Sequence, residues 1–460
     1  MKLTCILLRF WDKFQYCFKR ILDVLEYKHK VVQKIFLLLI MNCLFAEASE
    51  KQIFDFRARA GLPNICEKIN QKDTVRVAYF GGSITAQAGW RVQSFAYLKE
   101  QFPNTPFVEI NATMGGTGSL LGVLRMDKDV LRYNPDLVFV EFAVNDSETA
   151  SQVVLRSMEG IVRKLWKQNP FCDICFVYTV TESILEKTGL EQVHHTVIEM
   201  ERIADYYGIP SVYLPRRVID LLQNGQLIMR PPLGQMLKVS GDELNENSIP
   251  RKEDDGKIYF SPDGVHPFLN TGHVLYMQML RTALDTMLCK EGTAFTHLMR
   301  SPLSVGNYEG TKSISVGSMQ SKGPWLNVPK DSSLYKNYQY RFDELWIGEV
   351  GATLEFTFKG SGLVSYDIIS PEGCRLEITV DGKKSYVDRF DGYCTYPRFH
   401  YAELISNLDR SKSHKVLIRI VDTGLDKYNI LFEQNRKDLQ SNPDKYEPIR
   451  WYLNSLFIIP

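Results

Sequence analysis

The sequence has no excess of charge of either sign. Its 460 residues contain 55 Lys and Arg against 54 Asp and Glu, which gives a formal net charge of +1. A protein that binds nucleic acid needs a basic patch or stripe to face the phosphates, and this charge balance indicates none. We therefore expect no nucleic-acid partner, and a neutral polymer or a small ester fits the composition at least as well.

The chain also has no apolar run of comfortable membrane-spanning length. The most apolar stretch, Ile35–Phe45, is much shorter than the ~20 residues that a spanning helix needs. It follows Lys30 and Lys34 and precedes an Ala-Glu-Ala triplet, which is the layout of a secretory signal peptide with its cleavage site. The alternative is an N-terminal membrane anchor. The sequence predicts a protein that is secreted, periplasmic or associated with the cell surface, with no stable membrane span after signal cleavage.

Cysteine is scarce, and its spacing disfavours a zinc site. Nine cysteines occur in the chain, three of them in the first 48 residues. Cys172 and Cys175 form a Cys-x-x-Cys pair, but the second pair that a zinc site would need is absent. An exported protein can form disulfides. Cys374 and Cys394 are the best candidates for a bridge, because both lie in the same C-terminal β-rich region.

Strand-like and helix-like segments alternate between about residue 73 and residue 290. The expected strands are Val75–Tyr79, Phe107–Ile110, Leu137–Ala143, Ile174–Val180 and Ser211–Leu214, and the expected helices are Gly89–Phe102, Ser119–Tyr133, Thr149–Gln168, Glu191–Tyr207 and Thr271–Cys289. Repeated strand–helix units of this size are typical of a parallel sheet with helices on both faces. In such a fold, ligands bind at the carboxyl ends of the strands.

The pattern changes from about residue 300 onward. Apolar residues alternate with polar ones at 354–358, 376–380 and 416–420, and Asp381-Gly382 is a typical hairpin turn. Several short strands separated by turns indicate a β-sandwich.

Three regions are therefore expected along the chain. Residues 1–48 are a signal region, and its first 29 residues are interpreted as a spurious extension from a wrongly chosen upstream start codon. Residues 49–298 form the α/β domain. Residues 299–460 form an all-β sandwich domain.

Four short motifs lie beside the strands and helices of the α/β region: Gly81-Gly82-Ser83-Ile84-Thr85, Asn111-Ala112-Thr113-Met114-Gly115-Gly116, Ala143-Val144-Asn145-Asp146 and Asp263-Gly264-Val265-His266. Glycines before Ser83 let the chain turn sharply and expose the hydroxyl, and a serine nucleophile needs an adjacent base. His266 can supply that base, with Asp263 to fix its tautomer. The Asn145 amide and the Gly116 N–H can donate hydrogen bonds to a developing oxyanion.

Each motif also has a simpler interpretation. Ser83 can lie in an ordinary glycine-rich turn, although a P-loop is excluded because no Gly-Lys-Ser/Thr follows. Asp263 can cap a helix, and so can Asp146 or Ser147. What favours a shared site is the order of the motifs and their common position at one edge of the predicted sheet. The other histidines that fall in helical patterns are expected to be packing or surface residues: His194, His195 and His273.

Together, the four motifs resemble those of the SGNH (GDSL-type) hydrolase family over about residues 73–290. The resemblance implies a flavodoxin-like, three-layer α/β/α domain with a parallel sheet. It also implies a catalytic triad of Ser83, Asp263 and His266. The oxyanion hole would consist of the N–H groups of Ser83 and Gly116 and the side chain of Asn145.

Two positions depart from the family's pattern. Its Gly-Asp-Ser reads Gly81-Gly82-Ser83 here, and the first glycine of its Gly-x-Asn-Asp is Ala143. Neither change removes a reacting group. An α/β-hydrolase proper is disfavoured because Gly-x-Ser-x-Gly is missing.

The predicted reaction is ester hydrolysis through an acyl-enzyme, with no metal or organic cofactor. Exported members of this family with a β-sandwich, here expected to be jelly-roll-like, resemble carbohydrate acetylesterases, so the expected substrate is an O-acetylated polysaccharide or oligosaccharide. Trp90 and Arg91 are candidate substrate-binding residues, or they simply begin the next helix. Two alternatives stay open: a lipase or acyl-thioesterase that uses the same site, and a catalytically inactive glycan-binding protein.

Overall fold

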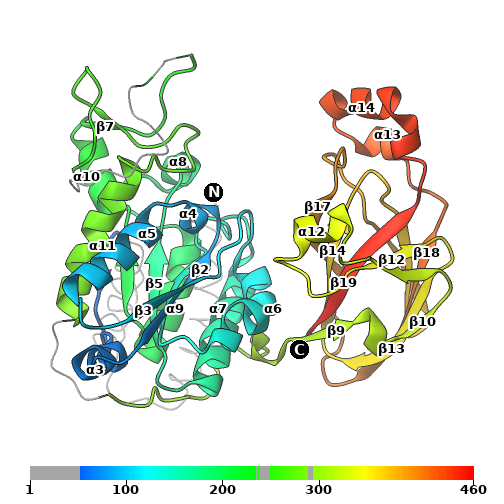
Figure 1. Cartoon of the computed structure of the whole chain (residues 1–460), viewed down its shortest axis with the longest axis horizontal. Helices are drawn as coiled ribbons and strands as arrows, with labels where there is room; N and C mark the ends of the chain where they lie inside the picture. Colours follow the sequence, from blue (N-terminus) through cyan, green and yellow to red (C-terminus); the bar gives the residue numbers. More distant parts are fainter. Residues whose placement is uncertain (1–51, 235–236, 238–248, 289–293) are drawn as a thin grey trace, which may run out of the picture. The chain divides into compact units, whose positions relative to one another are not determined.

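The α/β region is built on one six-stranded sheet (Figure 1). The computed structural model describes residues 52–234, 237, 249–288 and 294–460, so the signal peptide predicted within 1–48 lies outside the described residues. The strand order is β1-β6-β5-β4-β2-β3. The strands are β1 (Phe56–Arg57), β2 (Val75–Gly81), β3 (Phe107–Asn111), β4 (Leu137–Glu141), β5 (Asp173–Tyr178) and β6 (Ser211–Tyr213).

All five predicted strands are present, and neighbouring strands from β2 to β6 pair in parallel. The two-residue strand β1 pairs antiparallel with β6 at one edge, which the sequence did not predict. Every residue of β4 and β5 is buried, as expected for central strands of a sheet covered on both faces. The predicted layered fold is therefore confirmed, with an antiparallel edge strand added.

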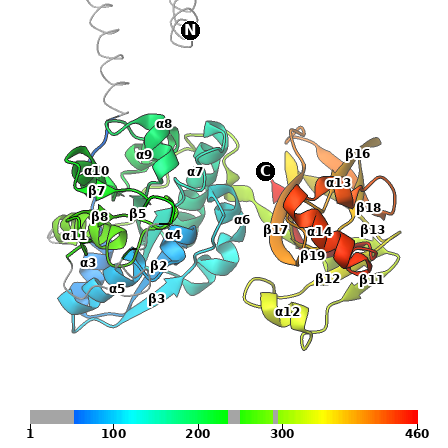
Figure 2. The same ribbon diagram turned by 90° about the horizontal axis from the view of Figure 1, so that it is seen from above.

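Helices cover both faces of this sheet (Figure 2). They are α3 (Pro63–Gln71), α4 (Ser83–Ala86), α5 (Trp90–Gln101), α6 (Ser119–Asp129), α7 (Ser151–Gln168), α8 (Glu182–Thr188), α9 (His195–Tyr207), α10 (Arg216–Gln223) and α11 (Gly272–Leu288). Helices α5 and α10 pack against α11, and α6 and α9 pack against α7. Between α10 and α11, β7 (Leu227–Ile228) and β8 (Ile258–Tyr259) form a short parallel pair. Among the described residues, no helix combines the length and the apolar character that a membrane span requires.

The β-rich region contains two antiparallel sheets (Figure 1). One has the order β10-β13-β18-β15-β16, and the other has the order β11-β12-β19-β14-β17 with β9 also paired to β19. The strands are β9 (Lys312–Ser315), β10 (Gln320–Lys322), β11 (Trp325–Asn327), β12 (Trp346–Glu349), β13 (Thr353–Lys359), β14 (Gly362–Ile369), β15 (Arg375–Val380), β16 (Lys383–Asp388), β17 (Arg398–Ile405), β18 (Ser413–Val421) and β19 (Arg450–Ile459). Three short helices accompany them: α12 (Ser333–Tyr338), α13 (Lys427–Ile430) and α14 (Arg436–Ser441).

One apolar core joins the two sheets. Leu354 and Ile418 of the first sheet and Leu363 and Leu453 of the second belong to the same buried cluster. The predicted hairpin turn Asp381-Gly382 joins β15 to β16, and both of its residues have positive φ, as a two-residue turn of type I′ requires. The predicted β-sandwich is confirmed.

The structure does not support the expected disulfide. Cys374 and Cys394 are both free and buried. Cys374 belongs to the sandwich core, whereas Cys394 belongs to a separate small cluster around Phe390 and Leu431. Burial raises the pKa of the Cys394 thiol to about 12. Sharing a β-rich region was too weak a criterion, because a bridge requires two Cβ atoms at close range.

Candidate active site

The turn that carries the predicted nucleophile, Ser83, lies at the carboxyl end of β2, where the strand passes directly into α4. Ser83 is the first residue of α4, and Gly82 is its N-cap with φ −89° and ψ −153°. A Cβ atom at Gly82 would come within 1.9 Å of the Asn145 Oδ1 atom. Glycine is needed here because two segments approach closely, and not because the turn has a positive φ.

Ser83, His266 and Asp263 form a continuous chain of hydrogen bonds. Ser83 Oγ lies 2.9 Å from His266 Nε2, although the two residues are 183 positions apart. His266 Nδ1 lies 2.7 Å from Asp263 Oδ2. Because an ionised carboxylate only accepts hydrogen bonds, Nδ1 carries the imidazole proton and Nε2 is left to accept the Ser83 proton. The structure thus brings together the three predicted triad residues in an arrangement suited to general-base catalysis.

The backbone of the loop itself orients the Asp263 carboxylate. Its Oδ1 atom accepts the N–H of Val265 at 2.9 Å and the N–H of His266 at 2.8 Å. Partial burial opposes ionisation, but the hydrogen bonds from the His266 ring and from these N–H groups outweigh it and hold the pKa of Asp263 below its usual value. The carboxylate is therefore charged at neutral pH and can stabilise an imidazolium at His266.

The loop after β3 approaches Ser83. A Cβ atom at Gly115 would lie 3.4 Å from Ser83 Cβ, and the next residue, Gly116, has φ +70°, a conformation that favours glycine. The N–H of Met114 donates to the Gly81 carbonyl at 2.9 Å, so this loop is tied to the end of β2. The Asn145 side chain lies against Gly82 from the end of β4. All the segments predicted to supply oxyanion donors therefore meet at the Ser83 turn.

Asp146 stabilises the start of α6 and not the start of α7, the next helix after Asp146 in the chain. Its Oδ1 and Oδ2 atoms accept the Ser119 N–H at 3.0 and 3.2 Å, at the start of α6. Gly118 allows this approach, because a Cβ atom there would lie 2.0 Å from Asp146 Oδ1. Burial raises the pKa of Asp146 to about 6, in spite of the bonds from Ser119. The prediction that Asp146 or Ser147 caps the following helix is wrong, since the N-cap of α7 is Ala150, without a side-chain cap.

Comparison with known proteins finds a family match within the α/β region. Residues 79–232 match the sequence model of the GDSL-like lipase/acylhydrolase family. The α/β region is therefore similar in sequence to GDSL-type hydrolases.

Solved structures share this architecture over both regions of the chain. A two-domain esterase active on acetylated mannans has 19% sequence identity and a TM-score of 0.62, over 87% of this chain and 98% of that one. A structure of a two-domain esterase active on acetylated mannans, co-crystallised with mannopentaose, has 19% identity and a TM-score of 0.58, over 88% of this chain and 98% of that one. At this identity, the likeness shows the fold. No curated protein matches the chain.

A buried glutamate lies beneath the turn that carries Ser83. Glu141, at the end of β4, accepts the Thr85 hydroxyl at 2.7 Å and the Thr179 hydroxyl at 2.8 Å. Burial raises the pKa of Glu141, while these two hydroxyls and the Gly82 N–H lower it. Glu141 therefore stabilises the turn around Ser83, because it accepts hydrogen bonds from Gly82 and from Thr85 of α4. Sequence reasoning missed this residue, although a single charge inside the apolar run Leu137–Ala143 was a signal for it.

The structure corrects the prediction that Trp90 and Arg91 bind substrate. Trp90 is 0% exposed and packs edge-on against Tyr79, with ring centroids 5.6 Å apart. Arg91 is 8% exposed, forms an ion pair with Glu109 and donates to the Thr85 carbonyl at 3.1 Å. Both residues belong to the start of α5, which was the alternative interpretation. Their proximity to Ser83 in the sequence did not show which way their side chains point.

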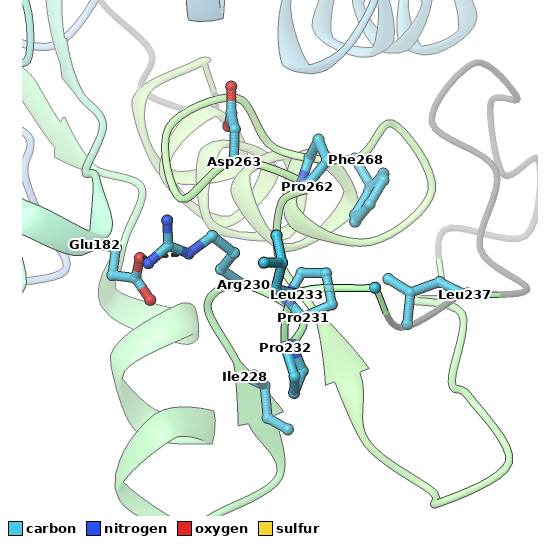
Figure 3. A pocket seen from close by; sticks show the side chains of 11 residues that line it. Glu182, Ile228, Arg230, Pro231, Pro232, Leu233, Leu237, Pro262, Asp263 and Phe268 are labelled. Atoms are coloured by element: carbon cyan, nitrogen blue, oxygen red, sulfur yellow. Dashed lines mark ion pairs between the residues drawn. The ribbon is translucent and has the colours of Figure 1, made fainter.

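A pocket of about 890 Å³ lies beside Asp263 in the α/β region (Figure 3). Its lining residues are Glu182, Ile228, Arg230, Pro231, Pro232, Leu233, Gly234, Leu237, Pro262, Asp263 and Phe268. Arg230 and Glu182 point toward each other and form an ion pair of 3.2 Å. The walls thus combine apolar surfaces with charged, hydrogen-bonding groups, as small-molecule sites commonly do.

Proposed function

We propose that this protein is a serine esterase that removes O-acetyl groups from a polysaccharide or an oligosaccharide. The observation that carries the proposal is the hydrogen-bonded chain from Ser83 through His266 to Asp263, with distances of 2.9 and 2.7 Å. This chain lies at the carboxyl edge of the sheet in a domain of an acylhydrolase family. A nucleophile, a base and an orienting carboxylate in this order are the groups that acyl transfer requires.

The proposed reaction has two steps. In the first step, Ser83 Oγ attacks the ester carbonyl carbon while His266 Nε2 takes its proton, and the N–H groups of Ser83 and Gly116 and the Asn145 amide hold the oxyanion. His266 then gives the proton to the leaving sugar oxygen, which yields the free hydroxyl and an acetyl-Ser83 ester. In the second step, His266 deprotonates a water molecule, which attacks the acyl carbon. His266 then returns this proton to Ser83 Oγ as the bond between Oγ and the acyl carbon breaks, which releases acetic acid and regenerates the free serine. Asp263 remains ionised throughout.

Replacing Asn145 with alanine is expected to lower kcat by about 10²- to 10³-fold with little change in KM, because the amide would donate to an oxyanion that exists only in the transition state. Steady-state hydrolysis of p-nitrophenyl acetate measures both constants. Asn224→Ala is the matched control, since Asn224 is exposed at the C-cap of α10. A wild-type kcat in Asn145→Ala would remove Asn145 from the proposed oxyanion hole.

Two observations support a glycan as the leaving group. The pocket beside Asp263 offers both proline and leucine surfaces and the Arg230–Glu182 ion pair. The solved two-domain esterase with the same fold is active on acetylated mannans, which makes acetylated mannan the first polymer to test. We also propose that residues 49–298 and 299–460 form two domains. We propose in addition that the protein acts outside the cell, because a polymeric glycan is found there.

We expect acetate release from O-acetylated mannan or xylan, together with a kcat/KM for p-nitrophenyl acetate about tenfold or more above that for p-nitrophenyl octanoate. The measurements are enzymatic acetate assay of the polymers and initial rates with the two esters. Chemically deacetylated polymer is the control for the first. A preference for octanoyl esters or acyl thioesters would instead indicate a lipase or thioesterase. Glycan binding without hydrolysis of any ester would indicate an inactive binding protein.

A further inference from the structure

A second histidine lies close to the proposed catalytic one. His273, in the first turn of α11, is 0% exposed. Its Nδ1 atom accepts the Trp90 N–H at 3.1 Å, and its Nε2 atom lies 3.1 Å from Gln87 Oε1. The ring packs directly on Gly89, where a Cβ atom would come within 2.1 Å of His273 Cγ. His273 is therefore a buried packing residue, as one of the two predicted roles has it, and both of its ring nitrogens also form hydrogen bonds.

The hydrogen bonds of His273 allow one tautomer. A backbone N–H can only donate, so Nδ1 must accept from Trp90 and the ring proton must lie on Nε2. Nε2–H then donates to Gln87 Oε1, which leaves the Gln87 amide nitrogen to donate to the Pro267 carbonyl at 3.2 Å. The Pro267 carbonyl can only accept a hydrogen bond. The Trp90 N–H at one end of this row of hydrogen bonds and the Pro267 carbonyl at the other therefore independently require the same donor and acceptor assignment. Burial, and to a smaller extent the nearby His266, lowers the pKa of His273 to about 3, so the ring is neutral at physiological pH.

This row of hydrogen bonds connects the segment that carries Ser83 to the segment that carries His266. Gln87 is the C-cap of α4, and its N–H donates to the Ser83 carbonyl at 3.1 Å. Pro267 directly follows His266. We propose that His273 and Gln87 are positioning residues that fix the His266 segment against the nucleophile turn. The inference rests on the proposed function, because it concerns the Ser83–His266 contact of that same reaction.

His273 itself is not suited to be the base. Both ring nitrogens are engaged, one by Trp90 and one by Gln87, and the proton on Nε2 leaves it no free acceptor. Its value to the reaction lies in geometry, since displacing a reacting group by about 1 Å can cost ~10²-fold in rate.

Gln87→Met tests this inference, because methionine keeps the length of the side chain and removes both amide hydrogen bonds. We expect kcat to fall by about tenfold while KM stays within about twofold and the unfolding temperature is nearly unchanged. Gln93→Met is the matched control: Gln93 is half-buried like Gln87 and donates to the nearby Leu269 carbonyl at 3.4 Å, but it lies on α5 and not on the nucleophile turn. Its kcat should equal that of the wild type.

A second variant keeps the test independent of folding defects. In His273→Asn, the shorter amide can still accept the Trp90 N–H but cannot reach Gln87. If the two residues act as one chain, the double variant should lose no more kcat than the Gln87→Met variant alone. An active wild type with unchanged kcat in Gln87→Met, or an equal loss in Gln93→Met, would overturn the inference. A wild type that hydrolyses no ester would instead overturn the proposed function.

Discussion

Replacing Ser83 with alanine is expected to reduce ester hydrolysis by about 10⁴- to 10⁶-fold. The hydroxyl supplies the atom that bonds to the acyl carbon, so its removal leaves the site only with binding and oxyanion stabilisation. The loss should appear in kcat, since binding of the substrate does not require the new bond. Initial rates with p-nitrophenyl acetate and with an acetylated polymer measure it.

The same variant separates chemistry from folding. Ser83 lies half-buried at the first position of a four-residue helix, and its hydroxyl contacts His266. We therefore expect the circular dichroism spectrum and the unfolding temperature to stay close to those of the wild type. A fluorophosphonate should label the wild-type protein and leave Ser83→Ala unlabelled. Wild-type turnover, or labelling at another residue, would show that the nucleophile lies elsewhere.

Asp263→Asn is expected to lower kcat by up to about 10⁴-fold. An asparagine amide can donate to His266 Nδ1, which would favour the tautomer that carries its proton on Nε2. That nitrogen could then no longer accept the Ser83 proton. Asp255→Asn is a suitable control, because Asp255 is also exposed and also accepts a backbone N–H, that of Lys257 at 2.9 Å. Equal activities in the two variants would rule out the proposed role of Asp263.

The Asp263 carboxylate should also contribute to stability in a defined pH range. Its folded-state pKa is below the ordinary value, so the folded protein binds fewer protons there than the unfolded chain. The stabilisation is therefore present above the unfolded pKa of about 4 and is lost as the pH falls through the folded value. Asp263→Asn should reduce the difference in unfolding temperature between pH 6 and pH 3.

Much of the fold could be predicted because its central strands carry unbroken apolar runs. Leu137–Glu141 and Asp173–Tyr178 are buried on both faces, and such strands are recognised in a sequence as short, nearly continuous apolar runs. Phe56–Arg57 could not be predicted, because two residues carry no period and their pairing depends on β6, far along the chain. The short helices α8 and α10 were not predicted for a similar reason, because seven or eight residues between loops show little periodicity.

Site residues could be predicted where the chemistry requires a particular residue type in a motif. They could not be predicted where their role depends on contacts between distant parts of the sequence. Ser83 and His266 stand in recognisable motifs. Gln87 and His273 are 186 positions apart, and their hydrogen bond exists only because α11 returns to the nucleophile turn. Glu141 is another such case, since its partner Thr85 lies 56 positions away. An isolated Gln or Glu in a sequence does not reveal which loop it will stabilise.

The contact between Gly82 and Asn145 limits how this chain can change. A side chain at position 82 would overlap the Asn145 amide, since a Cβ atom there falls 1.9 Å from Oδ1. Restoring the Gly-Asp-Ser of the wider family by one substitution would displace a side chain that the proposed oxyanion hole uses. A side chain at position 82 therefore requires a compensating change near Asn145. To introduce the family's Gly-Asp-Ser motif into this protein, an engineer would have to change position 82 and the surroundings of Asn145 together.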